Sequence, residues 1–568
     1  MRRTVNIGGV WEFFPLYDRQ CDTSLPDSLP EAESITVPSG WKRPGITLRD
    51  CHPGDVFGYP ERWNEADTGV LRRRVSIRAE RGERVFLHAE GVAQRCALYV
   101  DGRHICDHDE MFLPLHVDIT DVINDGEAEI TFVCTSFEST TLPSGAVKTT
   151  GLTGSWFGTN LRGIWGDISL TVLPQSHISD LAIRCSVRRG ELSVLPELTD
   201  APTDAHMHYE VLDGERAVLS FDGGSGGAVC RWEDAEYWDT DNPKLYRLRA
   251  ELRCGGELLD SCTERFGFRE IWTEGTKFIL NGKPINLRGD SWHFQGYVQM
   301  TKQYALNWYE LCRQNGVNYV RLHAEPHPRY YLDAADEVGM LIVDETAIYG
   351  SGKGMDAAHP QYLERCGRHA VRLVRRDRNH PCIIFWSIEN EMRWVDGRDE
   401  FKLHIPEWMA AMHREDPTRM ISLDGDNRLL PYEQTEIESY HYNIDGTLAQ
   451  WRREKPLTVG EHGGMWFICP QNASAYVGLG AYDDFEPCAI GFATKERLFQ
   501  EDARRNGVSG ISTFNFAYYF TRSMPDRDIV TGNPRMPMIP KYSLTVNNGM
   551  LPPEYPLCRE NPVMAFMR

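Results

Sequence analysis

Two glutamates follow strand-like segments in the second half of the chain, and they are the residues best suited to chemistry. The apolar run 383–388 leads into Asn390 and Glu391, and the run 457–460 leads into Glu461. Two carboxylates that face each other across a cleft hydrolyse glycosidic bonds, one as acid/base and the other as nucleophile. Each glutamate alone is equally well explained as a capped strand end or a surface salt bridge. The strands and helices that position the pair decide between these interpretations.

Eight strand-like segments after residue 272 alternate with helical segments. One of these helices covers 361–378, where apolar residues recur at spacings of three and four, and its arginines between 372 and 378 are expected to form a solvated face. Strands that alternate with helices predict a parallel sheet, and eight of them predict a (β/α)8 TIM barrel with its chemistry at the C-terminal strand ends. The predicted strands are 286–292, 319–323, 341–347, 383–388, 420–424, 438–442, 457–460 and 510–516.

The first half of the chain has the pattern of β-sandwiches. Short strands such as 84–89 and 96–100 are separated by turn signals, for example at 101–102, and the pattern restarts near Pro174. Frequent short strands with turns between them are typical of sandwiches. The sequence therefore predicts a multidomain β plus α/β protein, with two sandwiches before the barrel.

The charge of the chain limits the partners that it can bind. Its formal net charge is −21, from 61 basic and 82 acidic residues among 568. Such a surface repels phosphate backbones and anionic lipids, which argues against a nucleic acid or a membrane as a partner. The apolar runs fall short of the roughly 20 residues that a membrane span needs. A neutral or cationic small substrate suits this charge better.

Cysteines and the N-terminus bear on the compartment. The 15 cysteines are scattered, and the N-terminal stretch lacks the apolar segment of a secretory signal. Their spacing indicates neither a disulfide framework nor a zinc site, and no histidine–carboxylate spacing indicates a catalytic metal. We therefore expect a reduced, cytoplasmic chain without a metal or a cofactor, although a chain trimmed of its signal would look the same. The sequence leaves open whether the chain forms a homo-oligomer.

Segment 380–391, His-Pro-Cys-Ile-Ile-Phe-Trp-Ser-Ile-Glu-Asn-Glu, resembles the acid/base signature of glycoside hydrolase family 2. Nearly the whole chain matches that family's pattern in the right order. The resemblance implies a jelly-roll sandwich at 1–173, an immunoglobulin-like sandwich at 174–271, and a catalytic barrel with a proline-rich C-terminal tail at 272–568. It also implies a carbohydrate substrate. Further matching segments are 112–120, 163–168, 241–246, 266–269, 278–284, 318–321 and 336–345.

Carried over residue by residue, the resemblance implies a retaining exo-β-glycosidase. Glu391 becomes the acid/base and Glu461 the nucleophile. Asn390 would bind the sugar 2-OH, and Tyr442 would steady the nucleophile and keep it ionised. Glu391 should have a raised pKa so that it can donate a proton near neutrality, while Glu461 stays charged.

The chain departs from the family pattern around the expected sugar subsites. Glu389 replaces a usual glycine, and it is expected either to form a salt bridge with an arginine at the barrel wall or to tune Glu391. Arg321 is expected to support the catalytic carboxylates from below. The remaining candidates for contact with the sugar, each with a purely structural alternative, are Asp290, His293, His323, Glu325, Trp466 and Asn515.

The resemblance leaves the sugar open. β-Galactosidase is the first expectation, because it is the commonest activity of the family. β-Glucuronidase is the alternative, since segment 513–520 resembles that branch and Arg535 offers a guanidinium to a uronate carboxylate. A catalytically weak carbohydrate-binding protein on the same fold is a third interpretation, against which the two intact glutamates argue.

Overall fold

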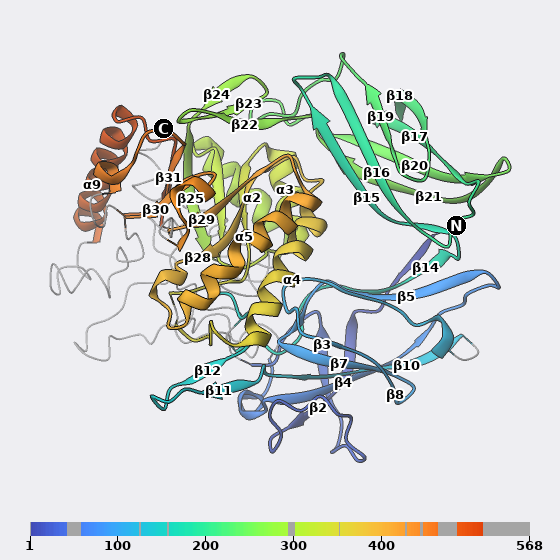
Figure 1. Cartoon of the computed structure of the whole chain (residues 1–568). Helices are drawn as coiled ribbons and strands as arrows, with labels where there is room; N and C mark the ends of the chain where they lie inside the picture. The colour runs from blue at the N-terminus through green and yellow to red at the C-terminus, as the bar shows by residue number, and fades with distance from the viewer. Residues whose placement is uncertain are drawn as a thin grey trace.

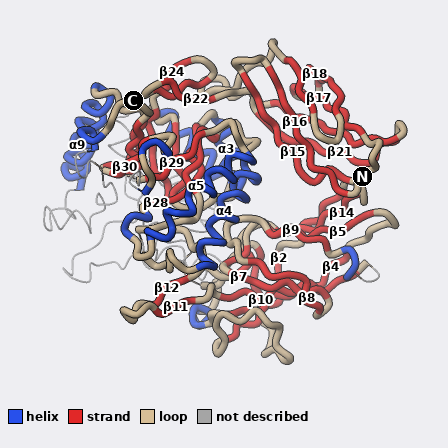
Figure 2. The backbone as a smooth tube through the Cα atoms, viewed as in Figure 1, coloured by secondary structure: helices blue, strands red, loops and turns tan. Residues whose placement is uncertain are grey.

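The computed structural model describes residues 2–42, 58–123, 126–155, 158, 160–293, 301–351, 353–425, 429–442, 447–463 and 485–514. Two bodies built of strands lie beside a third in which helices surround a central sheet (Figures 1 and 2). The predicted fold class, two β-sandwiches and an eight-stranded barrel, is confirmed. In the described ranges, no helix combines the length and the apolar character needed to cross a membrane.

The first sandwich packs a four-stranded sheet, in the order β1-β14-β5-β9, against a six-stranded sheet, β3-β2-β4-β10-β7-β8. Side chains alternate between the two faces of a strand, and one face meets the other sheet, so Val85, Leu87 and Ala89 of β5 are all buried. The bounds are β1 (Arg3–Asn6), β2 (Gly9–Leu16), β3 (Glu33–Val37), β4 (Thr68–Ser76), β5 (Glu83–Ala89), β6 (Val92–Ala93), β7 (Arg95–Val100), β8 (Arg103–His108), β9 (Leu115–Asp118), β10 (Glu127–Thr135), β11 (Ser139–Thr141), β12 (Val147–Thr149), β13 (Gly163–Ile164) and β14 (Ile168–Pro174).

The second sandwich packs β15-β16-β19 against β18-β17-β20-β21. Its core contains Leu192 and Val194 from the first of these sheets and Tyr209 and Leu248 from the second. A three-stranded sheet, β22-β23-β24, follows it and leads into the barrel. The bounds are β15 (His177–Ser186), β16 (Glu191–Thr199), β17 (His206–Asp213), β18 (Arg216–Gly223), β19 (Ala228–Arg231), β20 (Tyr246–Cys254), β21 (Glu257–Phe266), β22 (Ile271–Glu274), β23 (Lys277–Leu280) and β24 (Lys283–Ile285).

The barrel has eight parallel strands in the order β29-β28-β27-β26-β25-β32-β31-β30, and its two end strands pack against each other. Each predicted strand corresponds to an observed one. The strands are β25 (Leu287–His293), β26 (Tyr319–His323), β27 (Leu341–Glu345), β28 (Ile383–Asn390), β29 (Met420–Asp424), β30 (Glu438–His441), β31 (Leu457–His462) and β32 (Gly510–Thr513). The helices are α2 (Lys302–Gln314), α3 (Arg329–Val338), α4 (Pro360–Asp377), α5 (Arg398–Glu415), α6 (Thr447–Gln450) and α9 (Phe485–Arg505).

The arginines between 372 and 378, on α4 and directly after it, do not form the solvated face that the sequence predicted. They donate hydrogen bonds to both sandwiches, so α4 joins these two bodies to the barrel. Their spacing on the helix could not show this, because their partners lie far upstream in the chain. The contacts are Arg372 to the Pro114 carbonyl (2.6 Å), Arg376 to the Phe112 carbonyl (3.1 Å), and Arg375 and Arg378 to Asp180 (3.2 and 2.6 Å).

Arg365, earlier on α4, is the arginine whose loss should weaken this joint most. It is buried and donates to the Asp109 carboxylate at 2.8 Å and to the Thr150 carbonyl at 2.9 Å. Arg365→Ala leaves these acceptors without that donor, and we expect it to lower the apparent free energy of unfolding by about 3 kcal/mol. Urea unfolding measures this. Arg189→Ala, which removes an exposed arginine paired with Glu191, is the control. Equal effects of the two variants would contradict the prediction.

Candidate active site

Glu391 and Glu461 lie at the C-terminal end of the barrel. Glu391 directly follows β28, and Glu461 is the penultimate residue of β31. The backbone of Glu391 is left-handed, with φ 53° and ψ 34°, and leads into the 3-10 helix η5 (Met392–Trp394). Such a conformation costs a non-glycine residue about 1–2 kcal/mol and is found preferentially at functional sites. The side chains are only 14% and 6% exposed, so burial strengthens their electrostatic contacts.

His441, at the end of β30, contacts both carboxylates. Its Nδ1 lies 2.6 Å from Oε1 of Glu391 and 3.5 Å from Oε1 of Glu461, and its Nε2 lies 3.2 Å from Oδ1 of Asp424. One carboxylate oxygen of Glu391 lies within 4.8 Å of one oxygen of Glu461. The imidazole therefore joins the two glutamates into one buried group.

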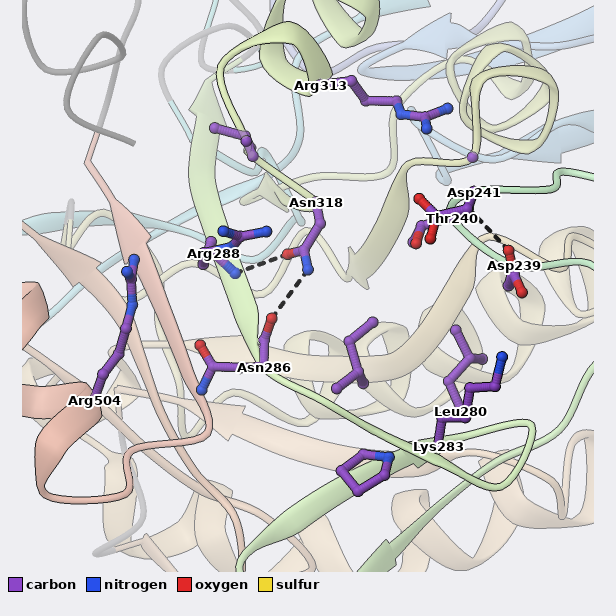
Figure 3. Close-up of a pocket in the computed structure, with 15 residues that line it drawn as sticks. Asp239, Thr240, Asp241, Leu280, Lys283, Asn286, Arg288, Arg313, Asn318 and Arg504 are labelled. Carbon is purple, nitrogen blue, oxygen red and sulfur yellow. Dashed lines mark hydrogen bonds between the residues drawn. The ribbon is translucent and has the colours of Figure 1, made fainter. Parts of the chain in front are cut away.

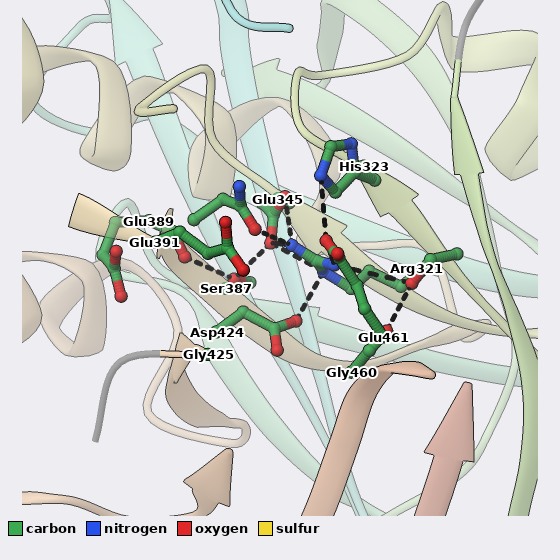
Figure 4. A network of polar contacts seen from close by, with 12 residues as sticks. Arg321, His323, Glu345, Ser387, Glu389, Glu391, Asp424, Gly425, Gly460 and Glu461 are labelled. Carbon is green, nitrogen blue, oxygen red and sulfur yellow. Dashed lines mark hydrogen bonds and ion pairs between the residues drawn. The ribbon is translucent and has the colours of Figure 1, made fainter. Parts of the chain in front are cut away.

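Arg321, on β26, is the centre of the network drawn in Figure 4. It donates to Oε1 of Glu461 at 3.0 Å and to the two oxygens of Glu345 at 2.9 and 3.0 Å. It also donates to Oδ1 of Asn390 at 2.6 Å, and its Nε lies 2.5 Å from Oδ2 of Asp424. A guanidinium that is 1% exposed and contacts three carboxylates fixes each of them in orientation.

The charges of the network differ from the expectation for Glu391. Burial alone would lower the pKa of His441, but the carboxylates of Glu461 and Glu391 raise it to about 10. Burial alone would raise the pKa of Glu391, but the His441 cation outweighs it and lowers that pKa. The pKa of Glu391 is therefore lowered and not raised as expected, because a buried cation lies 2.6 Å from its carboxylate. The sequence did not reveal this cation.

His441→Gln tests this coupling. The variant removes the cation beside Glu391, so the pKa of Glu391 should rise. The alkaline limb of the pH profile of kcat/KM, which reports deprotonation of the acid in the free enzyme, should move to higher pH. His413→Gln, which removes a histidine paired with Glu436 at 2.6 Å on α5, is the matched control. An unchanged or lowered limb in His441→Gln would refute the coupling.

Glu389 is fully buried and holds the turn at Glu391. Its Oε2 accepts a hydrogen bond from the backbone N–H of Met392 at 3.0 Å, at the start of η5. A carboxylate in this position satisfies an N–H group that has no partner within the helix. The two roles expected for Glu389, a salt bridge with an arginine and the tuning of Glu391, stay predictions.

Asn390 is held from two sides. Its Oδ1 accepts from Arg321, and its Nδ2 donates to Oγ of Ser351 at 3.2 Å. Ser351 in turn donates to Oε2 of Glu391 at 2.5 Å. The backbone N–H of Tyr442 donates to the carbonyl of Glu461 at 2.6 Å. The expected effect of the Tyr442 side chain on the nucleophile stays a prediction.

The structure brings His323 to the site and places Glu325 at the edge of the barrel. Nε2 of His323 lies 3.1 Å from Oε1 of Glu461. Glu325 accepts the backbone N–H of Ser155, from the first sandwich, at 2.7 Å, and burial raises its pKa to about 7. Asp290 is fully buried on β25. Contact of these residues with a sugar stays a prediction.

Three expected sugar contacts cannot be placed. Trp466 and Asn515 lie outside the described residues. His293 ends β25, but its side chain also falls outside the described part.

Four members of the network were not predicted from the sequence. Asp424 and Glu345 each end a barrel strand, so the acid at a strand end was an available signal. His441 lies within a predicted strand, where a histidine has many structural roles. Ser351 lies outside the strands, and no sequence signal marks it.

Two groups in the described ranges bring metal-ligand atoms together. One is Glu391 with His441 and Glu461, and the other is a buried cluster of Asp336, His380 and Cys382. A protonated His441 has no lone pair for a metal. In the other cluster, His380 pairs with Asp336 at 2.7 Å, and burial raises the pKa of the Cys382 thiol. Metal ligands must be deprotonated, so a metal at either group would first have to displace a proton.

Comparison with known sequences gives matches over most of the chain. The glycosyl hydrolases family 2 sugar binding domain matches residues 5–174, the glycosyl hydrolases family 2 model matches 177–269, and the family 2 TIM barrel domain matches 271–486. A "Putative beta-glucuronidase" of Formosa agariphila is 26% identical over 445 residues, 74% of this chain and 51% of its own. A "Beta-galactosidase" of Alteromonas mediterranea is 24% identical over 535 residues, 84% of this chain and 48% of its own. The chain spans about half the length of these relatives.

A solved structure shares the fold over most of this chain. The β-glucuronidase from Ruminococcus gnavus in complex with N1-substituted uronic isofagomine superposes with a TM-score of 0.71 at 18% identity, covering 94% of this chain and 96% of its own. This likeness concerns the fold. Because the three domain matches follow one another in order, the chain belongs to glycosyl hydrolases family 2.

Proposed function

We propose that the chain is a retaining exo-β-glycosidase that removes terminal β-linked sugars, with Glu461 as nucleophile and Glu391 as acid/base. The observation that carries this proposal is the approach of their carboxylate oxygens to within 4.8 Å. Retaining enzymes hold their two carboxyl groups about 5–5.5 Å apart, whereas inverting enzymes separate them by about 6.5–9.5 Å to admit a water molecule. Membership of the family supports the same reading.

The reaction proceeds in two displacements. In the first, Glu461 attacks the anomeric carbon while Glu391 gives its proton to the departing glycosidic oxygen, so a glycosyl ester forms on Glu461 and the aglycone leaves as an alcohol. In the second, Glu391 takes a proton from water, and the resulting oxygen attacks the anomeric carbon and releases Glu461. Two inversions give net retention of the β configuration.

The charges around Glu391 suit this change of role. The negative charge of Glu461 acts to raise the pKa of Glu391, and the His441 cation acts to lower it. A sugar that displaces water from the site raises this pKa, which favours the acid form for the first step. Esterification then neutralises Glu461 and leaves His441 beside Glu391. The pKa of Glu391 falls, which favours the base form for the second step.

The β-galactoside is our first candidate substrate. The Alteromonas relative that bears the name of a β-galactosidase matches 84% of this chain. Arg321, the guanidinium beside the two glutamates, is already bound by carboxylates and is a poor receptor for a uronate. The β-glucuronide is the second candidate, which the name of the Formosa relative favours. It requires another cation, for which the sequence offers Arg535, outside the described residues.

A panel of p-nitrophenyl glycosides tests the proposal. We expect hydrolysis of β-glycosides alone, with the highest kcat/KM on the galactoside and, by proton NMR, the β-anomer as the first product. The highest kcat/KM on the glucuronide would select the second candidate. The α-anomer as first product would exclude a retaining mechanism, and sugar binding without turnover would identify a carbohydrate-binding protein.

A further inference from the structure

A pocket of about 660 Å³ lies at the end of the barrel opposite to Glu391 and Glu461. It is lined by the residues just before β25, β26 and β27, by the hairpin β23–β24, by the end of α9, and by residues 239–241 of the second sandwich. Strand starts face away from the catalytic end of a barrel, so this pocket is separate from the candidate active site.

Two guanidinium groups stand on one side of this pocket. Arg288 and Arg504 lie on the same wall, with residues 239–241 across the pocket (Figure 3). Arg504 donates to Oε1 of Gln500 at 2.9 Å. Among the described residues, the guanidinium of Arg288 has no carboxylate partner within ion-pair distance, although the chain carries a net charge of −21. Two cations on one wall repel each other, and an anionic ligand between them relieves that repulsion.

The electrostatic surroundings of Arg504 agree with this arrangement of the two arginines. Burial lowers its pKa, the charge of Arg288 lowers it further, and Glu501 acts against them. Nearby charges of the same sign disfavour the charged form. The pair of arginines is therefore close enough to interact.

The opposite wall is rich in hydrogen-bond acceptors. Asp239, Thr240 and Asp241 form it, and the cations of Lys283 and Arg313 also line the pocket (Figure 3). Oδ1 of Asp239 accepts the backbone N–H groups of Asp241 and Asn242 at 2.9 and 2.8 Å, which fixes the loop. The carboxylates on this side accept hydrogen bonds from hydroxyl groups. The pocket thus favours a ligand that is anionic at one end and hydroxylated at the other.

We propose that this pocket binds an acidic carbohydrate, a sugar that carries a carboxylate or a sulfate. The anionic group lies between Arg288 and Arg504, where guanidinium groups form charge-assisted hydrogen bonds, and the sugar hydroxyls face Asp239 and Asp241. The site is independent of the proposed hydrolysis, and its occupant is held without being cleaved.

Isothermal titration of the full chain with D-glucuronate and with glucose 6-sulfate tests the proposal. Both should bind, and the tighter of the two identifies the anionic group. The double variant Arg288→Gln/Arg504→Gln should bind them about 10-fold or more weakly, because hydrogen bonds to charged groups are lost. Arg505→Gln, next to the pocket on α9 and 71% exposed, is the matched control and should bind as the unmodified chain does.

Three results would overturn the proposal. The first is equal affinity of the double variant and the unmodified chain. The second is equally tight binding of inorganic sulfate or of neutral glucose. Tight binding of sulfate would show that the sugar is not recognised, and tight binding of glucose would show that the anionic group is not. The third is a loss of kcat/KM on nitrophenyl glycosides together with the loss of binding, which would place the sugar in the active site. Arg504→Gln alone, at an exposed helix end, carries the same test if the double variant does not fold.

Discussion

Glu461→Ala should abolish turnover. The variant removes the carboxylate that attacks the anomeric carbon, while the network around Arg321 retains Glu345 and Asp424 as partners. We expect kcat to fall on the order of 10⁴-fold or more, as when other enzymes lose a covalent nucleophile. Release of nitrophenol from the best β-glycoside of the panel measures the loss.

Azide distinguishes a lost nucleophile from a damaged site. The alanine side chain leaves space on the face from which Glu461 attacks, and azide that enters there displaces the aglycone with inversion. The expected product is therefore the α-glycosyl azide, together with partial recovery of the rate on activated substrates. Glu433→Ala, which removes a glutamate with a 75% exposed side chain, should keep normal turnover and give no azide product. Recovery of a β-azide from Glu461→Ala would refute the assignment.

The barrel could be predicted from the sequence because its strands carry a strong local signal. All eight residues of β28 are buried, so the strand is a nearly continuous apolar run that ends in polar residues. A run of this kind positions Glu391, and β31 positions Glu461 in the same way. Local pattern and parallel topology together were thus enough to place both glutamates at one end of the barrel.

The contacts around those glutamates depend on distant parts of the chain and could not be predicted. His441 is 50 residues from Glu391 in sequence, and the 2.6 Å contact between them follows from how β30 and β28 are placed in the closed barrel. The same limit explains the error on α4. Arg372 looks solvent-facing on a helical wheel, but the carbonyl that it meets is 258 residues away.

Glu391→Gln should discriminate sharply between leaving groups. An acid matters most when the departing oxygen is a poor leaving group, because protonation offsets the charge that develops on it. Glutamine keeps the size of the side chain and can still meet Ser351, but it cannot give that proton. We expect a loss of about 10²–10⁴-fold on alkyl glycosides and disaccharides. The glycosylation step on dinitrophenyl glycosides should be much less affected, and the alkaline limb of the pH profile should flatten.

Glu389→Gln is the matched control for this prediction, because Glu389 is the rival for the role of acid. The two residues are two apart, and on an extended strand their side chains would point the same way. The left-handed backbone of Glu391 breaks that alternation. Glu389 accepts a hydrogen bond from the Met392 N–H, and the amide oxygen of a glutamine can accept the same bond. Glu389→Gln should therefore leave the leaving-group dependence unchanged. If Glu389→Gln shows the dependence and Glu391→Gln does not, the two roles must be exchanged.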